Sequence, residues 1–380
     1  MRSRKILRAA ILLVGAFFCG YASGQAVSQN SNCPGCAGSG SGKMAKPILT
    51  TAPAQNGAVI ASLSSLTAGA TILYTIDGST PNASSPSTIT YKSPFLVGVK
   101  LTVSALAIAP GMAASPVLTV PISLKIPPGT LVWSDEFSNS TGADAAPNSQ
   151  IWTYDTGSSG FGNQELETYC AWDSAASPCD PANPNAYEDK SGILHIVARK
   201  PSTGVYTSAR MKTQGLFSFQ YGRIEARMKL PESQGMWPAF WLLGNSIASV
   251  DWPGCGELDV MEHIDGSNPQ NWGYDWVQGS VHGTGLNGGV QYHTVSFSAA
   301  DWHTYGMIWA KGKIQYYVDN PSNVYATFTP NSQAGKWPFD SGPEFVILNL
   351  AVGGDWPGLP DATTVFPSEI QVDYVRLYTN

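Results

Sequence analysis

Alternation of apolar and polar residues is the feature of this chain that most restricts its fold. It is clearest in "GRIEARMKL" (222–230), "KIQYYVD" (313–319) and "EIQVDYVRLY" (369–378). A period of two residues places alternate side chains on opposite faces of a strand. From residue 127 onward, the sequence shows no sustained 3.6-residue apolar period of the kind an amphipathic helix needs. It therefore predicts an all-β protein of packed, mostly antiparallel sheets.

The length of 380 residues allows two folded domains. Residues 46–126 alternate Val, Ile, Leu and Thr around turns at Asp77-Gly78 and Pro110-Gly111, a pattern that predicts a small antiparallel sandwich. "KIPPGT" (125–130) closes this module, because consecutive prolines hold the chain extended. Residues 127–380 are then expected to form one larger sandwich.

The N-terminus has the pattern of a secretory signal. Residues 1–24 combine a basic start, an apolar run and small residues before a predicted cleavage after Gly24. The apolar run is shorter than the roughly 20 residues that a membrane span needs. Residues 25–45 are small and polar, as in a flexible linker. We expect a secreted protein, extracellular or periplasmic, with no retained membrane segment.

Cysteine usage and net charge restrict the redox state and the partners. Loss of the signal would leave Cys33, Cys36, Cys170, Cys179 and Cys255, an odd number, so at least one would be unpaired or bridge two molecules. Cys170 and Cys179 flank a short loop and are expected to form a disulfide. The Cys33/Cys36 pair lacks a second CxxC for zinc and is read as a bridge within the tail. A net charge of −6 argues against nucleic acid as a partner.

Three carboxylates gather in "WPGCGELDVMEH" (252–263), in a chain with only 13% charged residues. On a strand, Glu257 and Asp259 share one face. Strict alternation would turn Glu262 into the apolar core, where an unpaired carboxylate is too costly. One extra residue at Val260-Met261, a β-bulge, would return Glu262 to the acidic face. The sequence therefore predicts a bulged strand with three acids on one side.

A solvated surface or a cation site is the competing interpretation of these acids. Apolar neighbours argue against solvation, and a single strand lacks the wrapping loop of a calcium site. Glycoside hydrolysis needs a carboxylate pair of this kind. On a flat strand, the Cα atoms of the outer glutamates would lie about 13 Å apart, whereas a retaining pair needs carboxyl groups about 5 to 5.5 Å apart. The strand is therefore expected to belong to a sheet that curves around its substrate.

The motif resembles the Glu-x-Asp-x-x-Glu signature of glycoside hydrolase family 16, in its laminarinase branch. Further segments recur in family order over residues 131–378: "LVWSDEF", "GNQELETY", "SARMKTQGLFSFQYGRIEARMKLP", "GMWPAFWLLG", "GSVHG", "DWHTYGMIWAKGKIQYYVD", "LNLAVGGDWPG" and "QVDYVRLY". The resemblance implies a concanavalin-like β-jelly roll over residues 127–380. It also implies that Glu257 is the nucleophile and Glu262 the acid, with Asp259 between them tuning their ionisation.

The smaller module has a resemblance of its own. "YTIDGSTP" and "VSALAIAPGM" are similar to the immunoglobulin-like β-sandwich found at the C-termini of chitobiases. Sugar-binding faces usually expose flat aromatic rings, but residues 46–126 offer only Tyr74, Tyr91 and Phe95, and all 12 tryptophans lie after residue 130. We expect this accessory module to act as a spacer or stabiliser.

The resemblance also assigns a substrate cleft and one metal site. Positions matching the family's cleft are Trp237, Trp241, Trp252, Trp356, Asn163, Arg210 and His282. For each tryptophan the alternative is core packing, and His282 could instead be structural. Family members often carry one structural calcium, for which Glu136 and Asp373 could supply ligands here. No cofactor is expected for catalysis.

The function implied is a secreted, monomeric endo-β-1,3-glucanase that cleaves laminarin-like polysaccharides with retention of configuration. Galactan or mixed-linkage β-1,3-1,4-glucan cleavage by the same family is one alternative. A lectin-like protein without turnover is another, although the presence of all three acids argues against it. A transglycosylase would share the covalent intermediate and is not separated by sequence.

Overall fold

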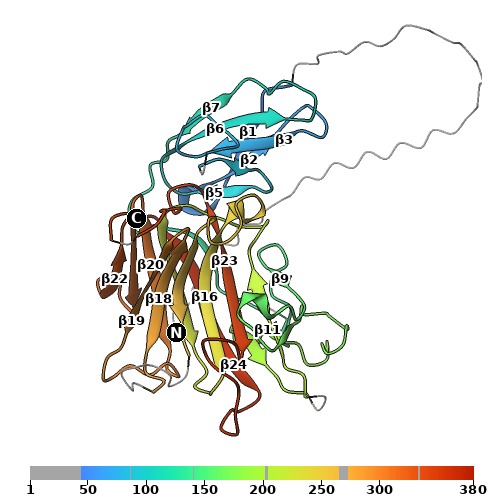
Figure 1. The fold of residues 1–380 in the computed structure, drawn as a ribbon, viewed down its shortest axis with the longest axis vertical. Coiled ribbons are helices and arrows are strands. Elements are labelled where there is room, and N and C mark those ends of the chain that lie inside the picture. Colours follow the sequence, from blue (N-terminus) through green and yellow to red (C-terminus); the bar gives the residue numbers. More distant parts are fainter. Residues whose placement is uncertain (1–43, 86, 140, 202–203, 265–272, 333) are drawn as a thin grey trace, which may run out of the picture. The chain divides into compact units, whose positions relative to one another are not determined.

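The computed structural model describes residues 44–380, apart from 86, 140, 202–203, 265–272 and 333 (Figure 1). The predicted signal peptide (1–24), nearly all of the predicted linker (25–45) and the Cys33/Cys36 pair lie outside the described residues. In the described part, no helix is long and apolar enough to cross a membrane. Its helical segments are short 3-10 turns at Gln55–Gly57, Gly160–Gly162 and Asn245–Ala248. The all-β prediction is confirmed.

Residues 46–126 form two small antiparallel sheets. One has the order β1 (Ile48–Pro53), β2 (Val59–Ser64), β5 (Phe95–Val97), and the other the order β4 (Ile89–Thr90), β3 (Thr71–Thr75), β6 (Leu101–Ile108), β7 (Leu118–Ile122). Tyr74, Phe95 and Val103 lie in their shared apolar core. The two expected turns are present, with positive φ at Gly78 and Gly111. The division of the chain near residue 126 stays a prediction.

The remaining strands form two large sheets (Figure 1). The eight-stranded sheet runs β11 (Ala186–Glu188), β12 (Leu194–Ala198), β24 (Ser368–Tyr378), β15 (Gly222–Lys229), β20 (His303–Ala310), β21 (Lys313–Val318), β22 (Val324–Phe328), with β8 (Leu131–Asp135) also on β24. The seven-stranded sheet runs β19 (Leu286–Tyr292), β18 (Val277–Gly283), β17 (Glu257–Glu262), β16 (Met236–Gly244), β23 (Glu344–Val352), β14 (Arg210–Lys212), β9 (Thr153–Asp155).

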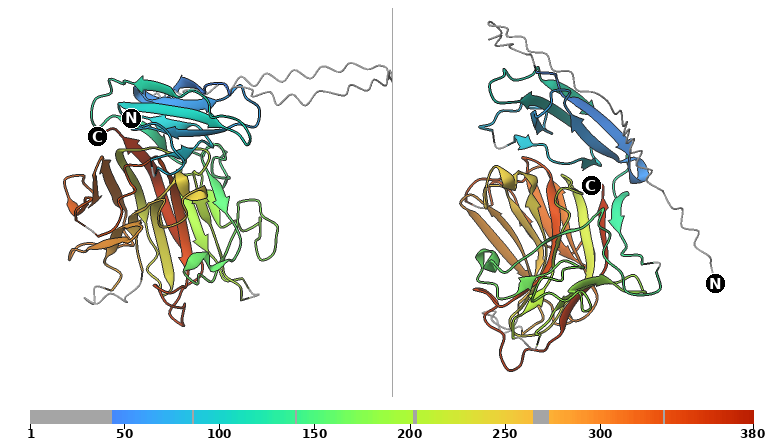
Figure 2. Two further views of the ribbon diagram at one scale, coloured as in Figure 1. Left: turned by 45° about the horizontal axis from the view of Figure 1, so that its top comes forward. Right: turned by 90° about the vertical axis from the view of Figure 1, so that its right-hand side faces the viewer.

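The two large sheets pack face to face, as the views in Figure 2 show. Leu258 and Leu348 of the seven-stranded sheet share one apolar core with Ile224 and Met307 of the eight-stranded sheet. Such burial of apolar area is the main force that holds two sheets together. Gly279 lets β18 approach the opposite sheet, because a Cβ there would lie 2.5 Å from Cδ2 of Tyr316.

The central strands β16 and β23 are buried on both faces, unlike the half-exposed strands at the sheet edges. On the face away from the shared core, Ala239, Trp241, Leu243, Phe345 and Ile347 form a second apolar cluster, which Cys255 joins. Because of this second cluster, the middle of the outer face of the seven-stranded sheet is apolar and buried.

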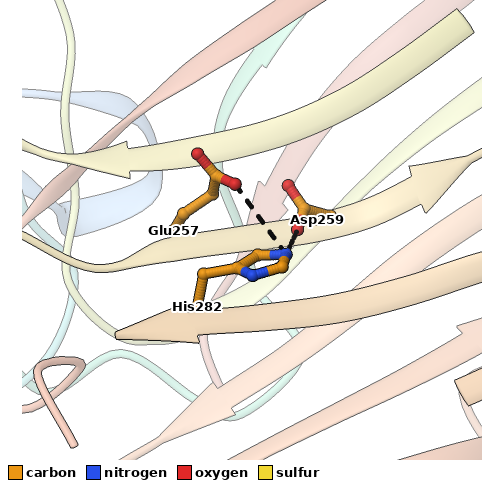
Figure 3. Close-up of side chains that lie close together, drawn as sticks. All are labelled: Glu257, Asp259 and His282. Carbon is orange, nitrogen blue, oxygen red and sulfur yellow. Dashed lines mark ion pairs between the residues drawn. The ribbon is translucent and has the colours of Figure 1, made fainter. Parts of the chain in front are cut away.

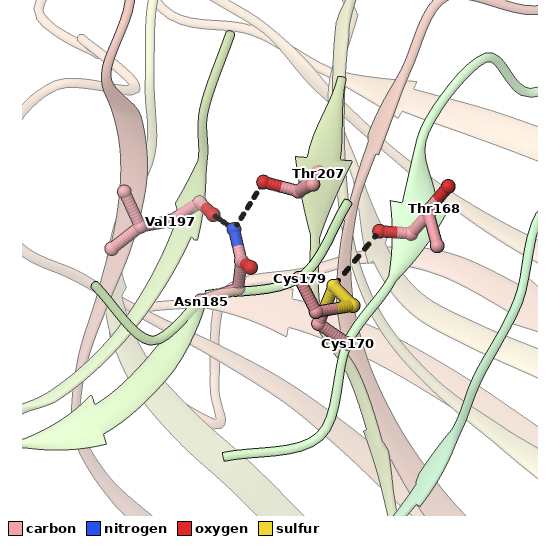
Figure 4. The surroundings of a disulfide bond; sticks show 6 residues. All are labelled: Thr168, Cys170, Cys179, Asn185, Val197 and Thr207. Carbon is pink, nitrogen blue, oxygen red and sulfur yellow. Dashed lines mark hydrogen bonds between the residues drawn. A yellow bond between two sulfur atoms is a disulfide. The ribbon is translucent and has the colours of Figure 1, made fainter. Parts of the chain in front are cut away.

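A disulfide joins Cys170 to Cys179, as the sequence predicts (Figure 4). It follows β10 (Thr168–Tyr169), which pairs in parallel with β13 (Thr207–Ser208). Close by, the Nδ2 of Asn185 donates hydrogen bonds to the Val197 carbonyl and the Thr207 hydroxyl at 2.7 and 3.1 Å. Cys255 is a buried free thiol.

Candidate active site

Strand β17 carries the predicted bulge. Asp259 pairs with Trp241 on β16, and Met261 with Phe240, so that Val260 is left without a partner. The register toward β18 shifts at the same place, between Asp259 and Glu262. The shift turns Glu262 onto the face that already carries Glu257 and Asp259, and all three line one cavity. The bulge prediction is confirmed.

Each side-chain oxygen of Glu262 has its own hydrogen-bond donor. The Trp237 indole donates to Oε1 at 3.2 Å, and the Ser280 hydroxyl donates to Oε2 at 3.1 Å. The Nε2 of Gln278 in turn donates to the Ser280 hydroxyl at 3.0 Å. These contacts come from β16 and β18, the two neighbours of β17, so the orientation of the Glu262 carboxyl is fixed from both sides.

His282 stands beside the other two acids (Figure 3). Its Nε2 lies 3.1 Å from Oδ2 of Asp259 and 3.9 Å from Oε1 of Glu257. In the pairing of β17 with β18, His282 is directly opposite Glu257, so its ring reaches both carboxylates on the same face. A histidine within this distance can neutralise part of the charge of the pair.

The three acids have raised pKa values with a common main cause. Burial raises the pKa of Glu257, Asp259 and Glu262 to about 8 in each case, because the charged form loses water. The charge of Asp259 adds to this for both glutamates, whereas His282 lowers the pKa of both. The Ser280 and Trp237 hydrogen bonds also lower that of Glu262. The acids therefore titrate as a coupled set, in which full ionisation is unfavourable.

Two cavities of about 520 and 400 Å³ extend over this face of the sheet. They have Glu257, Glu262, Asn163, Trp237 and Trp252 in common. Every residue predicted to bind substrate lines one or both: Asn163, Arg210, Trp237, Trp241, Trp252, His282 and Trp356. Sequence positions up to 193 residues apart, from 163 to 356, thus meet in one cleft over the three acids.

The cleft's aromatic rings differ in exposure. Trp252 is 58% exposed and lies at the rim of the cleft, where a ligand can reach its ring. Trp241 is only 9% exposed and lies at the bottom of the cleft. The rings of Trp237 and Trp356 meet edge to face at 5.4 Å. The Arg210 guanidinium lies 4.7 Å from the Trp241 ring centre. Flat rings beside hydrogen-bonding groups suit the apolar faces and hydroxyls of sugars.

Ser280 and Asn349 were not among the sequence candidates. Asn349 of β23 accepts a 2.8 Å hydrogen bond from the Trp241 indole and lines the cleft. Both residues lie in segments with family resemblance, "GSVHG" and "LNLAVGG". For Asn349 a signal existed: it is a polar residue within the apolar run "VILNLAV", where a buried polar group needs a partner. Ser280 shares one face of its strand with Gln278 and His282, so its polarity alone did not single it out.

The residues expected to hold calcium have other partners. The Glu136 carboxylate forms a two-pronged pair with Arg376 at 2.8 and 2.6 Å, and Asp373 pairs with Arg227 at 2.7 Å. In the described part of the chain, the only group of three or more possible metal ligands is the carboxylate and histidine set of β17 and β18. The roles of Glu136 and Asp373 as calcium ligands stay predictions.

A cleft lined by tryptophans and by neighbouring carboxylates is the arrangement that glycoside hydrolases need. Residues 178–376 match the family described as Glycosyl hydrolases family 16, and residues 52–119 match the Chitobiase/beta-hexosaminidase C-terminal domain. The chain belongs to glycosyl hydrolase family 16, and both family resemblances seen in the sequence are confirmed.

Individual relatives agree with this assignment. A beta-glucanase of Rhodothermus marinus is 38% identical over 276 residues, which cover 67% of this chain and 86% of the relative. A keratan-sulfate endo-1,4-beta-galactosidase of Sphingobacterium multivorum is 34% identical, over 65% of this chain and 54% of the relative. The crystal structure of the laminarinase catalytic domain from Thermotoga maritima superposes with a TM-score of 0.56 at 38% identity, covering 67% of this chain and 99% of that domain. The β-jelly-roll sandwich of this family is thereby confirmed.

Proposed function

We propose that this protein hydrolyses internal β-1,3-glucosidic bonds of laminarin-like glucans with retention of configuration. The observation that carries the proposal is the bulge in β17, which puts Glu257 and Glu262 on one face of one strand with Asp259 between them. The beta-glucanase and laminarinase relatives favour β-glucan as the substrate class.

In the first step, a Glu257 oxygen attacks the anomeric carbon and the bond to the leaving sugar oxygen breaks. Glu262 gives its proton to that oxygen, so one sugar chain departs as an alcohol and the other stays as an ester on Glu257. In the second step, Glu262 takes a proton from water, whose oxygen displaces the Glu257 carboxylate. Two inversions give net retention, and both carboxyl groups return to their starting states.

The contacts of Glu262 hold its carboxyl group in one orientation for both steps. The Trp237 indole donates to Oε1, and the Ser280 hydroxyl donates to Oε2. The charge of Asp259 raises the pKa of Glu262 and keeps its proton in place before attack. Esterification of Glu257 removes one negative charge and favours ionisation of Glu262 for the second step.

The deciding experiment is proton NMR of laminarin digestion within minutes of mixing. We expect β-anomeric reducing ends first, because a retaining pair gives them before mutarotation. Early α-anomers would contradict the mechanism. Glu257→Gln is expected to abolish turnover while it still binds laminarin oligosaccharides. A lectin would instead show no products in the wild type and unchanged binding in the variant.

The galactosidase relative makes sulfated galactan the second substrate to test. Among the described residues that line the two cavities, Arg210 is the one Lys or Arg side chain, so they contain no cluster of basic residues. Since sulfate groups call for such charges, we place β-glucan first. Parallel digestion of laminarin, lichenan and keratan sulfate ranks the candidates, and product lengths on chromatography reveal any transglycosylation.

Export, a monomeric state and one structural calcium stay predictions from the sequence. N-terminal sequencing of protein recovered from the culture medium tests cleavage after Gly24, and light scattering tests the monomer. Thermal melting with EDTA and then added Ca²⁺ tests the metal. A Tm that falls on chelation and returns with Ca²⁺ would support one structural calcium.

A further inference from the structure

Two glutamates outside the catalytic strand are turned inward beside the cleft. In "NQELETY" (163–169), Glu165 is 8% and Glu167 is 0% exposed, while the leucine between them, Leu166, is 39% exposed. This inverts the usual placement of acidic and apolar side chains. Buried carboxyl groups persist where partners compensate for the lost water. The partners of Glu165 lead into the substrate cleft.

Four hydrogen bonds form a chain that ends on Glu165. Trp241 Nε1 donates to Asn349 Oδ1 at 2.8 Å, and Asn349 Nδ2 donates to the Tyr169 hydroxyl at 3.2 Å. The Tyr169 hydroxyl donates to Glu165 Oε2 at 2.8 Å. The other oxygen, Oε1, accepts from Asn163 Nδ2 at 3.0 Å. The chain thus links Asn163 and Trp241, two cleft residues, through one carboxylate.

The direction of donation fixes the charge state that the chain needs. Indole and amide N–H groups can only donate, so every bond points toward Glu165. Both Glu165 oxygens act as acceptors, as in an ionised carboxylate. The neighbouring Glu167 accepts a 2.7 Å hydrogen bond from the Val352 N–H, and burial followed by the charge of Glu165 raises its pKa to about 8. Burial thus favours the protonated form of Glu167.

The same cavity receives the ends of this chain and the catalytic acids. Asn163, Glu165, Trp241 and Asn349 line the cavity of about 400 Å³ together with Glu257 and Glu262. Side chains held in one orientation before substrate arrives lose less freedom on binding. A fixed donor at Asn163 and a fixed ring at Trp241 would therefore favour binding without taking part in bond cleavage.

We propose that Glu165 is a positioning residue for glucan binding: its carboxylate orients Asn163 directly and Trp241 through Tyr169 and Asn349. This inference rests on the proposed glucanase function and adds a determinant of affinity to it. The ligand is a sugar residue of the glucan, bound in the cavity of about 400 Å³ that Asn163 and Trp241 line.

Glu165→Gln is the primary test, because one of its two acceptor positions becomes an NH₂ group that meets a donor. We expect KM for laminarin oligosaccharides to rise about tenfold with kcat within about twofold, the pattern of lost uniform binding. Tyr169→Phe removes only the hydroxyl in the middle of the chain and should raise KM in the same way. Glu232→Gln, an exposed glutamate outside both cavities, is the matched control and should change neither constant.

Binding measured without turnover separates this inference from the proposed function. Calorimetric titration with laminarin oligosaccharides in a Glu257→Gln background should show a Kd about tenfold weaker when Glu165→Gln is added. Wild-type hydrolysis with unchanged KM and Kd in both variants would overturn the inference alone, as would a loss of kcat at constant KM. A wild type that neither hydrolyses nor binds these glucans would overturn the proposed function as well. If Glu165→Gln does not fold, Tyr169→Phe decides.

Discussion

Nε2 of His282 lies 3.1 Å from Oδ2 of Asp259, whose side chain is almost fully buried. The same nitrogen is 3.9 Å from Glu257, so one imidazole serves two of the three acids. Its positive charge, when protonated, favours the ionised form of the nucleophile, which the apolar surroundings disfavour. We therefore expect His282 to affect the proposed reaction through the ionisation of its two neighbours.

Replacing His282 by glutamine should shift the acidic limb of the pH profile. His282 lowers the pKa of Glu257, so its loss raises that pKa and protonates more of the nucleophile at a given pH. The acidic limb of kcat/KM should move to higher pH, with about tenfold lower activity for each unit of pKa on that limb. A variant whose acidic limb stays at the same pH, while only the maximum of kcat/KM falls, would contradict this explanation.

Replacing Ser280 by alanine should act on the opposite limb. The Ser280 hydroxyl lowers the pKa of Glu262, so its removal raises that pKa and keeps the acid protonated to higher pH. We expect the alkaline limb of the kcat/KM profile to move to higher pH. We also expect kcat to fall several-fold, because the ionised base of the second step is less stabilised. Ser280→Thr keeps a hydroxyl and is the control. If the alkaline limbs of Ser280→Ala and Ser280→Thr lie at the same pH, the hydrogen bond does not set the pKa of Glu262.

Trp252 offers a test of sugar stacking at the rim. It is 58% exposed and lines both cavities, so Trp252→Ala should remove contact area with little loss of core packing. Since an aromatic ring contributes about 1 kcal/mol or more to such contacts, KM should rise about fivefold or more. Leu359, 65% exposed and outside the cleft, gives the control Leu359→Ala. Matching KM values for the two variants would remove Trp252 from the binding surface.

The Cys170–Cys179 bridge should contribute to stability. Closing its short loop constrains the unfolded chain, which corresponds to about 2 to 3 kcal/mol in the loop-entropy treatment. The double variant Cys170→Ala/Cys179→Ala is expected to lose this much free energy of unfolding in urea titration. Cys255→Ala, which changes a free thiol, controls for the chemistry of the substitution. Unchanged stability of the double variant would mean that the loop is held by its hydrogen bonds alone.

The fold and the bulge followed from local sequence pattern. Alternation is a property of each strand by itself, so the sandwich could be predicted without knowledge of strand order. The bulge followed from the position of Glu262, because the alternative would have buried its charge. The Cys170–Cys179 bridge was predictable for a similar reason, since its loop is short.

The partners of the acids could not be predicted in the same way. The contact between Ser280 and Glu262 depends on the register between β17 and β18, with residues 265–272 between them. Likewise, Glu136 meets Arg376 across 240 positions of sequence, a contact that the pattern within one strand does not indicate. Glu165 was missed because buried acids run against the usual preference of the residue.

The extra residue in β17 also sets the parity of the strand. Glu257 and Glu262 are an odd number of positions apart and face the same way only because Val260 is skipped in the pairing. A chain with one residue fewer here would have an even spacing and would need no skip to keep both acids together. The number of residues between the two glutamates and the bulge in the backbone therefore depend on each other. A change in one without the other would turn one acid away from the substrate.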